Sequence, residues 1–500
     1  MGQEIAALEN TKTWVLTALP YGKQPIGCKW VYKIKMHADG SIERYKARLI
    51  AKGYTQQQGL DYFETFSPVV KLTTVRLVLA LAASKHWYLH QLDVNNAFLH
   101  GDLDEEVYML LPFLYKTEKP GQVCKLLKSL YGLKQASRQW NYKLATTLLS
   151  LGYIQSKSDY SLFVKIDSAH ITILLVYVDD IVLACDDIQE IQIVKALLNA
   201  KFKIKDLGQL TYFLCLEIAR SQQDINLSQR KYALELLEDA GLLGCQPVPT
   251  PIQPSTKFSK TEGKPYSDVH AYTRPDLCFV VSTLSQFLSN PLEDHYATTI
   301  RILRYIKNNP GQGLFFPSNT EHALKAFSDS DWAACPDTRR FVTGFNVFYG
   351  ASLINWKSKK QGTISRSSTE VECRVLASTT CEIQWLLYLL HDLKQPLLQP
   401  VPLFCDNQST IQIAQNPTMH ERAKHIEINC HLIRDKVQAG VIKLLSISTS
   451  AQLAGIHTKV LHLAQFQSLL SKLSIKDIFV HLCSYIYIPF LYLCSIFILL

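Results

Sequence analysis

The sequence predicts a chain of several α+β domains, and three observations support this. The chain has 500 residues, well beyond the size at which one hydrophobic core stops growing. Hydrophobic residues make up 47% and charged residues 19%, which excludes a disordered or fibrous protein. Segments with the two-residue period of strands are mixed with segments typical of helices along most of the length.

Charge and cysteine usage narrow the class of protein further. The formal net charge is +9, so a polyanionic partner fits the composition, although many enzymes share this balance. The 13 cysteines form no C-x-x-C pair, which argues against a zinc ribbon or a thioredoxin-type site. The polar start MGQEIAALEN has no signal-peptide core, so the cytosol or the nucleus is the expected compartment.

Sequence periodicity indicates two structured regions joined by a linker. In the first, KWVYKIKM and YKARLIAKGY predict strands with a cationic face, TTVRLVLALAASKHW predicts a helix, and ITILLVYVDDIVLACDD predicts a hairpin. The stretch Pro247–Tyr266 is dense in Pro, Ser, Thr and Lys, which is linker composition. A second α/β pattern runs from Leu324 to Lys459. We therefore expect domains at 1–246, 247–323, 324–460 and 461–500.

The C-terminal segment is apolar. Ile478–Leu500 contains no Asp, Glu, Lys or Arg, and its length meets the criterion of about 18 residues for a membrane span. Pro489, the many aromatic residues and the lack of a basic flank count against an anchor. Out-of-frame or read-through sequence is therefore favoured over a membrane anchor by roughly three to one.

Two adjacent carboxylates, Asp179 and Asp180, interrupt the apolar run of the predicted hairpin. Burying an unpaired carboxylate costs several kcal/mol, so the pair needs exposure at a turn, a shared proton or a bound cation. A surface turn without further function has about even odds on this motif alone. Asp93, near a strand end in LDVNNAF, would bring a third carboxylate to the same point.

A cluster of these carboxylates, without His or Cys beside them, would prefer hard cations. Mg²⁺ is therefore the expected metal, with Mn²⁺ as the alternative. Two such ions held close together stabilise both the attacking and the leaving oxygen of a phosphoryl displacement. The basic strand with Lys46, Arg48 and Lys52 would supply cations to a triphosphate.

Several blocks of sequence resemble the reverse transcriptase of copia-type retrotransposons. They are YVDD at Tyr177–Asp180, LDVNNAFLHGDL, SLYGLKQASRQW, RYKARLIAKGYTQ, TFSPVVKLTTVR and LGQLTYFLCLEIARS. The resemblance implies a right-hand polymerase with fingers, palm and thumb. In that fold Asp93 and Asp179 match the metal ligands of the palm, and Asp180 is the third acidic member.

The same resemblance implies a nucleotide-binding group. Phe98 matches a steric gate that would clash with a ribose 2′-OH and select deoxynucleotides, and an ordinary core side chain is the alternative. Lys46 and Arg48 match the fingers strand that grips phosphates, with a solvated cationic face as the alternative; which of the two touches the triphosphate stays open. Gly132 and Lys134 match the stretch under the incoming nucleotide, and an ordinary turn and helix entry are the alternative.

A second set of acids lies in AFSDSDW, STEVECRVLA and LFCDNQST. Brought together, these acids would form a Mg²⁺ cluster with no soft ligand. Their order resembles the RNase H domain that follows copia-type reverse transcriptases, with Asp329, Glu372 and Asp406 as the matching residues. Asp331 and Glu370 are the competing positions, and exposed acids of an ordinary domain are the default for any one alone. A cationic patch suited to the phosphates of a hybrid would consist of Lys357, Lys359, Lys360 and Arg366. A solvated surface without this role is the alternative, at even odds.

The sequence departs from the family in several places. Ala451 and Gly455 replace both carboxylates of a D-Q-L-A-D pattern, so the fourth metal ligand is missing. We therefore hypothesise that hybrid cleavage is much poorer than polymerisation; equal in-gel hydrolysis by wild type and Gly455→Asp would contradict this. Cys215 stands where the primer-gripping hairpin usually has Gly. The basic helical segment that usually precedes TRPD is missing, and the apolar tail replaces the usual ending.

Taken together, the resemblance implies an RNA-directed DNA polymerase, a nucleotidyltransferase, fused to an RNase H-like domain of reduced activity. Its expected partners are an RNA template, a DNA primer, the RNA–DNA hybrid and dNTPs. The alternatives are a decayed relic that only binds RNA or hybrid, and a tail-anchored membrane protein. Intact Asp93, Asp179 and Asp180 favour the enzyme.

Overall fold

The computed structural model describes two compact units of the chain. Unit 1 comprises Met1–Lys71 and Tyr88–Gln209, and unit 2 comprises Leu72–Trp87 and Leu210–Leu500. Much of the predicted linker and nearly all of the apolar tail lie outside the described residues. The residues that are not described are 37–40, 114, 116, 118, 168–169, 222–223, 255, 257–273, 288, 417–426 and 479–500.

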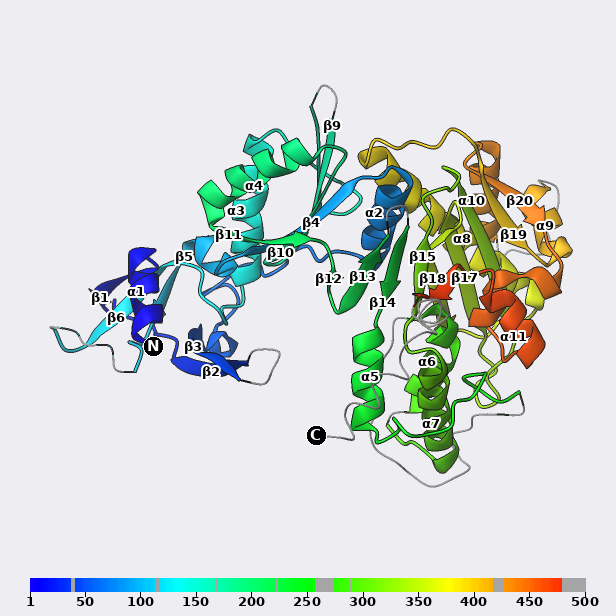
Figure 1. Ribbon diagram of the computed structural model, residues 1–500, viewed down its shortest axis with the longest axis horizontal. Coiled ribbons are helices and arrows are strands. Elements are labelled where there is room, and N and C mark those ends of the chain that lie inside the picture. Colours follow the sequence, from blue (N-terminus) through cyan, green and yellow to red (C-terminus); the bar gives the residue numbers. More distant parts are fainter. Residues whose placement is uncertain are drawn as a thin grey trace, which may run out of the picture. The chain divides into compact units, whose positions relative to one another are not determined.

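The larger sheet of unit 1 forms where the predicted aspartate hairpin pairs with the strand of Asp93 (Figure 1). Its strands in spatial order are β11 (Ile204–Gln209), β4 (Tyr88–Val94), β10 (Asp180–Cys185), β9 (His170–Tyr177), β8 (Leu162–Asp167) and β7 (Ile154–Gln155). Helices α3 (Ala136–Ser150) and α4 (Ile188–Phe202) pack on this sheet in one hydrophobic core. Each fully buried Leu or Ile of that core contributes about 2 kcal/mol, which fixes the register of β4 against β10.

Two smaller sheets complete unit 1. The predicted cationic strands form the antiparallel hairpin β2 (Cys28–Met36) and β3 (Ile42–Ala51), which carries Lys46 opposite Lys33 and Arg48 opposite Val31. The other elements are α1 (Gly2–Asn10), β1 (Trp14–Ala18), η1 (Gly53–Thr55), η2 (Ala97–His100), β5 (Asp102–Met109) and β6 (Gln122–Lys128). Strands β1, β6 and β5 form a three-stranded sheet.

Unit 2 contains a five-stranded antiparallel sheet with helices around it. Its strands are β12 (Tyr212–Phe213), β13 (Leu216–Arg220), β14 (Ile225–Ser228), β15 (Gln312–Phe316) and β21 (Ile475–Asp477). The helical elements are α2 (Leu72–Ser84), α5 (Arg230–Asp239), η3 (Pro275–Leu277), α6 (Cys278–Leu284), η4 (Ser285–Phe287) and α7 (Glu293–Asn308). Helix α2, the predicted TTVRLVLALAAS helix, is buried from Thr74 to Ala83, so it forms part of the core of unit 2.

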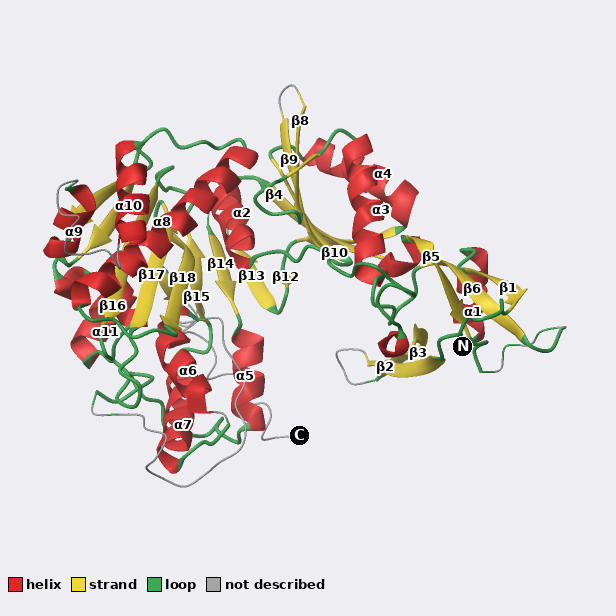
Figure 2. Cartoon of the chain, turned by 180° about the vertical axis from the view of Figure 1, so that it is seen from behind, coloured by secondary structure: helices red, strands yellow, loops and turns green. Residues whose placement is uncertain are grey.

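The second sheet of unit 2 holds the second set of predicted acids. Its spatial order is β18 (Ser352–Lys360), β17 (Val342–Tyr349), β16 (Leu324–Asp331), β19 (Val401–Cys405) and β20 (Ile442–Ser446). Strands β18, β17 and β16 are antiparallel, and β19 and β20 add on in parallel. The surrounding elements are α8 (Ser368–Asp392), α9 (Gln408–Gln415), α10 (Glu427–Gln438), η6 (Thr449–Ala451), η7 (Leu453–His457) and α11 (Leu463–Leu470). Helix α8 lies against β16, and α10 packs on α8 (Figure 2).

The structure therefore has the mixed α+β architecture that the sequence predicts, with strands and helices in both units. Among the described residues, none of the helices combines the length and the apolar character that a membrane crossing requires.

Candidate functional site

The backbone brings three acidic residues close together where β4 ends and β10 begins in unit 1. Asp93 on β4 is the register partner of Asp180, the first residue of β10. The N–H of Val94 donates to the carbonyl of Asp179 over 2.8 Å, so the turn between β9 and β10 is tied to the end of β4. The structure thus brings together the three acids that the sequence singled out, from segments far apart in the chain.

The turn that carries Asp179 is held in a strained conformation. Val178 has φ +53°, a left-handed value that is a genuine outlier for a β-branched residue. Its carbonyl accepts a 2.7 Å hydrogen bond from the indole Nε1 of Trp140, a side chain of α3 that is only 1% exposed. The hydrophobic core therefore fixes the turn, and backbone strain of this kind is often kept at functional sites.

The electrostatics of this cluster call for a cation. Burial raises the pKa of Asp180, and the charges of Asp179 and Asp93 raise it further, while the amide of Gln91 opposes them. That amide donates to Oδ1 of Asp180 over 3.2 Å. Within the described residues, no Lys or Arg forms an ion pair with any of the three carboxylates. An all-oxygen donor set with uncompensated charge fits a hard divalent cation such as Mg²⁺.

An aromatic and cationic wall stands beside the acids. The half-buried Phe98, in η2 just beyond β4, meets the ring of Tyr131 edge-on at a centroid distance of 4.9 Å. The guanidinium of Arg48 on β3 lies 4.0 Å above the same ring. Burial raises the pKa of the Tyr131 phenol. The charge of Arg48 lowers this pKa and the charges of Asp179 and Asp93 raise it, so Tyr131 interacts electrostatically with both the cation and the acids. Sequence reasoning missed Tyr131, although it directly precedes the glycine of the YGLKQ motif.

The remaining predicted nucleotide-binding residues surround this wall. Gly132 has φ +92°, and a Cβ there would come within 2.2 Å of the carbonyl oxygen of Ala51, so only glycine lets this loop lie against β3. Lys134 donates from Nζ to the carbonyl of Gln56 over 3.2 Å. For Lys46, burial lowers the pKa, and the nearby cations, Arg48 first among them, lower it further.

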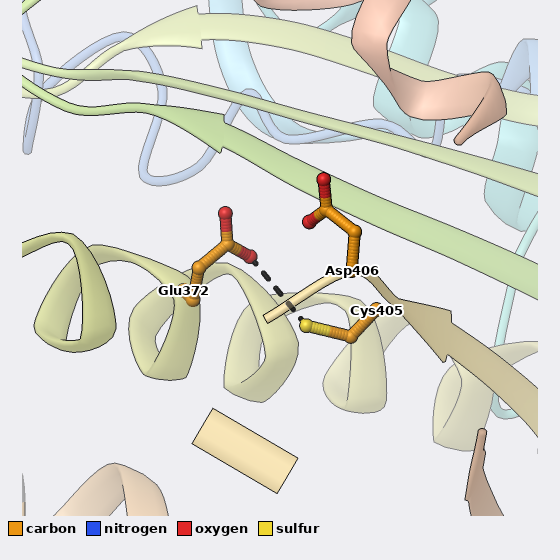
Figure 3. Close-up of side chains that lie close together, drawn as sticks. All are labelled: Glu372, Cys405 and Asp406. Atoms are coloured by element: carbon orange, nitrogen blue, oxygen red, sulfur yellow. Dashed lines mark hydrogen bonds between the residues drawn. The ribbon is translucent and has the colours of Figure 1, made fainter. Parts of the chain in front are cut away.

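A second acidic cluster forms in unit 2 at the ends of β16, β19 and α8. Oxygens of Glu372 and Asp406 and the sulfur of Cys405 all lie within 4.8 Å of one another. Figure 3 shows Glu372 reaching from α8 toward the end of β19, and its Oε2 is 3.8 Å from the Cys405 sulfur. The expectation of a cluster without a soft ligand is therefore wrong. The sulfur was overlooked because Cys405 adjoins Asp406 in sequence, and β19 side chains alternate in direction.

Asp329 is the most deeply buried acid of this cluster, with 1% exposure. Burial raises its pKa, and Lys459 and Thr458 oppose that effect. The hydroxyl of Thr458 donates to Oδ2 of Asp329, and Nζ of Lys459 lies 3.3 Å from Oδ1. Burial, Asp329 and Asp406 together raise the pKa of Glu372 to about 8, although Ser330 donates to it.

The competing acids have other surroundings. Glu370 forms a 2.7 Å ion pair with Arg374 and accepts the N–H of Arg366 over 3.0 Å, so it stabilises the start of α8. For Asp331, burial raises the pKa, Lys459 lowers it and Asp329 raises it, which places this acid at the edge of the cluster. The structure therefore favours Glu372 over Glu370.

The predicted basic patch of unit 2 is only partly available. Lys357 and Lys359 alternate along β18 and are exposed, as is Arg366. Lys360 points to the other side of β18, where its Nζ lies 2.8 Å from the sulfur of Cys335 and 2.8 Å from Oε1 of Gln286.

Comparisons with known proteins identify a family model and relatives that are similar to this chain. Residues 11–254 match the family model described as reverse transcriptase (RNA-dependent DNA polymerase). Over 96% of its length the chain is 43% identical to the retrovirus-related Pol polyprotein from transposon RE1 of Arabidopsis thaliana, of which it covers 34%. It is 30% identical to the putative transposon Ty5-1 protein of Saccharomyces cerevisiae, covering all of that protein and 58% of this chain.

A solved structure also aligns with most of the chain. It is the foamy viral protease-reverse transcriptase in complex with double-stranded DNA, with a TM-score of 0.47, 13% identity, and coverage of 90% of this chain and 69% of that one. The present chain spans about a third of the length of the RE1 polyprotein (34%). By its relatives and its matched domain, the chain belongs to the family of copia-type retrotransposon Pol polyproteins and carries the reverse transcriptase domain of that family.

Proposed function

We propose that this chain catalyses RNA-directed DNA synthesis at the cluster of Asp93, Asp179 and Asp180. The observation that carries the proposal is the pairing of Asp93 with Asp180 on neighbouring strands, with Asp179 in the tethered turn between β9 and β10. Membership of the reverse transcriptase family supports the reaction class. The substrates would be an RNA template, a DNA primer and dNTPs, and the primer 3′-OH would attack the α-phosphate.

The three carboxylates would hold the divalent cations of the reaction, with Mg²⁺ as the proposed ion. Such cations stabilise the charge that develops on the attacking and leaving oxygens of a phosphoryl displacement. The chain's own residues would do the rest of the work. Phe98, packed against Tyr131 at 4.9 Å, would exclude a 2′-OH from the nucleotide pocket because the ring occupies that space.

Arg48 is the better candidate than Lys46 for contact with the triphosphate. Its guanidinium stacks on Tyr131, the ring that also contacts Phe98, so it lies on the nucleotide side of the hairpin. A planar guanidinium also matches phosphate oxygens in a bidentate way, whereas an ammonium acts as a point charge. Lys46 would then contribute mainly to the positive potential of β2 and β3.

Primer extension on a poly-A template with Mg²⁺ tests the proposal. Asp179→Asn should lower the extension rate by about 10³-fold, since it removes a ligand and a charge from the metal site. Asp186→Asn is the matched control, because this exposed acid lies just beyond the opposite end of β10 and should leave the rate unchanged. Extension that survives Asp179→Asn would refute the assignment, and hybrid binding without any extension would favour the decayed relic.

We also infer a second, weaker activity in unit 2, the cleavage of RNA in RNA–DNA hybrid. The acids that would carry it are Glu372 and Asp406, which lie close enough to share one divalent ion, with Lys357 and Lys359 exposed to meet phosphates. The residues do not fit a second ion, because Asp329 is paired with Lys459 and position 455 is glycine. In-gel hydrolysis should therefore be faint in wild type and stronger in Gly455→Asp.

A further inference from the structure

An ammonium group sits on the buried acid of the second cluster. Nζ of Lys459 lies 3.3 Å from Oδ1 and 3.3 Å from Oδ2 of Asp329. The Lys459 side chain is 29% exposed and the Asp329 side chain only 2%, so the lysine enters from the surface and ends on a buried carboxylate. An uncompensated carboxylate at this depth would cost several kcal/mol, so the ammonium is needed where it is.

The segment that carries Lys459 is rigidly placed on the sheet. The side-chain amide of Gln452, just before η7, donates to the carbonyl of Ser328 on β16 over 2.9 Å. At the other end, the hydroxyl of Ser358 on β18 donates to the carbonyl of His457 over 2.7 Å. A Cβ on Gly344 of β17 would come within 2.7 Å of the His457 side chain. Since η7 lies this close to the strands, the following residue pair can reach Asp329 directly.

Position 455 faces the same point in space. A Cβ built on Gly455 would lie 3.8 Å from Nζ of Lys459 and 3.9 Å from Oδ2 of Asp329. A carboxylate at this position would therefore reach both the ammonium and Asp329. With glycine there, Lys459 and the hydroxyl of Thr458 are the groups that contact Asp329 from this segment.

We propose that Lys459 serves as a fixed cation in place of a second divalent ion, so that the cluster of unit 2 binds one ion instead of two. The inference rests on the proposed function of this cluster, in which Glu372 and Asp406 hold that one ion. Lys459 is a positioning residue: its ammonium neutralises Asp329 and keeps the carboxylate turned toward η7. A carboxylate at position 455 would draw the ammonium to itself and release Asp329 for a second ion.

Mn²⁺ binding to the full chain tests the proposal, measured from the electron paramagnetic resonance signal of free Mn²⁺. All chains carry Asp93→Asn and Asp179→Asn, which silence the polymerase cluster, and Asp406→Asn identifies the ion bound in unit 2. The parent should bind one Mn²⁺ there. Lys459→Met should bind one about tenfold more tightly, because a repelling charge is removed, and Gly455→Asp should bind two. Lys459→Arg and the control Lys472→Met, at an exposed lysine of unit 2, should match the parent.

Each other result has a definite meaning. Two Mn²⁺ ions in the parent, or the parent's affinity in Lys459→Met, would overturn the role of Lys459 and leave the metal site intact. A single ion in Gly455→Asp would also overturn the role of Lys459. If circular dichroism shows that Lys459→Met does not fold, the number of ions bound by Gly455→Asp still decides the test. No Mn²⁺ at the cluster in any chain would overturn the metal site itself, and the inference with it.

Discussion

The two acidic clusters of this chain solve one electrostatic problem in different ways. In unit 1, Asp93, Asp179 and Asp180 are half-buried, lie at a strand end and a turn, and have no ion pair with Lys or Arg among the described residues. In unit 2, Asp329 and Glu372 are 1% and 4% exposed, and hydroxyl and ammonium groups of the chain satisfy them.

The difference shows which interactions fix the positions of the acids in each cluster. The unit 1 acids depend on backbone placement, since a strand register, a tethered turn and a loop packed on β3 bring them and their neighbours together. The unit 2 acids depend on side-chain partners that compensate their burial. A cluster of the first kind is open to external cations, whereas one of the second kind is already partly neutralised. Mutations should therefore damage the two clusters through different routes.

The largest effect is expected where backbone meets backbone in unit 1. Gly132→Ala places a Cβ 2.2 Å from the carbonyl oxygen of Ala51 at a φ of +92°, so clash and strain together should cost about 3 kcal/mol. The denaturant midpoint should fall, and the KM for dNTP should rise. Gly121→Ala is the matched control, because Gly121 also has positive φ (+79°) but open space around it. Equal losses in both variants would mean that the loop contact is unimportant.

The tether of the aspartate turn comes next. Trp140→Phe removes the indole N–H that donates to Val178 over 2.7 Å and leaves a small cavity in the core, at a cost of about 2 kcal/mol. Primer extension should fall as well, because the strained turn loses its anchor. Trp332→Phe is the control: this indole donates to Ser365 over 3.0 Å but its residue is 49% exposed. A stable Trp140→Phe chain with full activity would contradict the role of the tether.

In unit 2, two threonines allow a hydrogen bond to a buried carboxylate to be compared with one to an exposed carboxylate. Thr458→Val removes the hydroxyl that donates to the buried Asp329, and should lower the free energy of unfolding by about 1–2 kcal/mol. Thr449→Val removes a hydroxyl that donates to Asp406 over 2.8 Å in an exposed place, and should cost under about 0.5 kcal/mol. Urea unfolding of the two variants measures the difference. A larger loss of stability for Thr449→Val than for Thr458→Val would contradict the greater importance of the hydrogen bond to the buried Asp329.

Sequence reasoning reached the strands and the acids of both clusters for a physical reason. Strands β9 and β10 are long apolar runs with strong β propensity, and a charged pair inside such runs has few inexpensive explanations. Helix α2 was also predictable, but its place in unit 2 was not. A helix buried from Thr74 to Ala83 is mostly apolar, with Arg76 as its one buried charge, and such a pattern does not indicate which sheet it packs on.

The missed residues act through contacts between distant segments. Lys459 is 130 positions from Asp329, and Tyr131 joins Phe98 to Arg48 although the three lie on separate elements. In sequence, Lys459 reads as one more surface lysine and Tyr131 as one more aromatic residue. Only the register of the sheets and the packing of η7 and the YGLKQ loop determine what these side chains touch. Periodicity carries no information on such pairings.

The smallest expected effect is a gain, and it separates functional strain from plain strain. The hairpin of β12 and β13 turns through Leu214 and Cys215, with φ of +52° and +62°, the left-handed values of a turn that favours glycine at its second position. Relief of about 1–2 kcal/mol of strain, less the entropy that glycine loses, should stabilise Cys215→Gly by about 0.5–1 kcal/mol. Cys215→Ala keeps the strain and should gain nothing in denaturant midpoint.

Val178 has a similar φ of +53°, but the tryptophan tether holds its carbonyl, so Val178→Gly should loosen the aspartate turn and slow primer extension. A gain in activity for Val178→Gly would show that the strain in that turn has no part in placing Asp179.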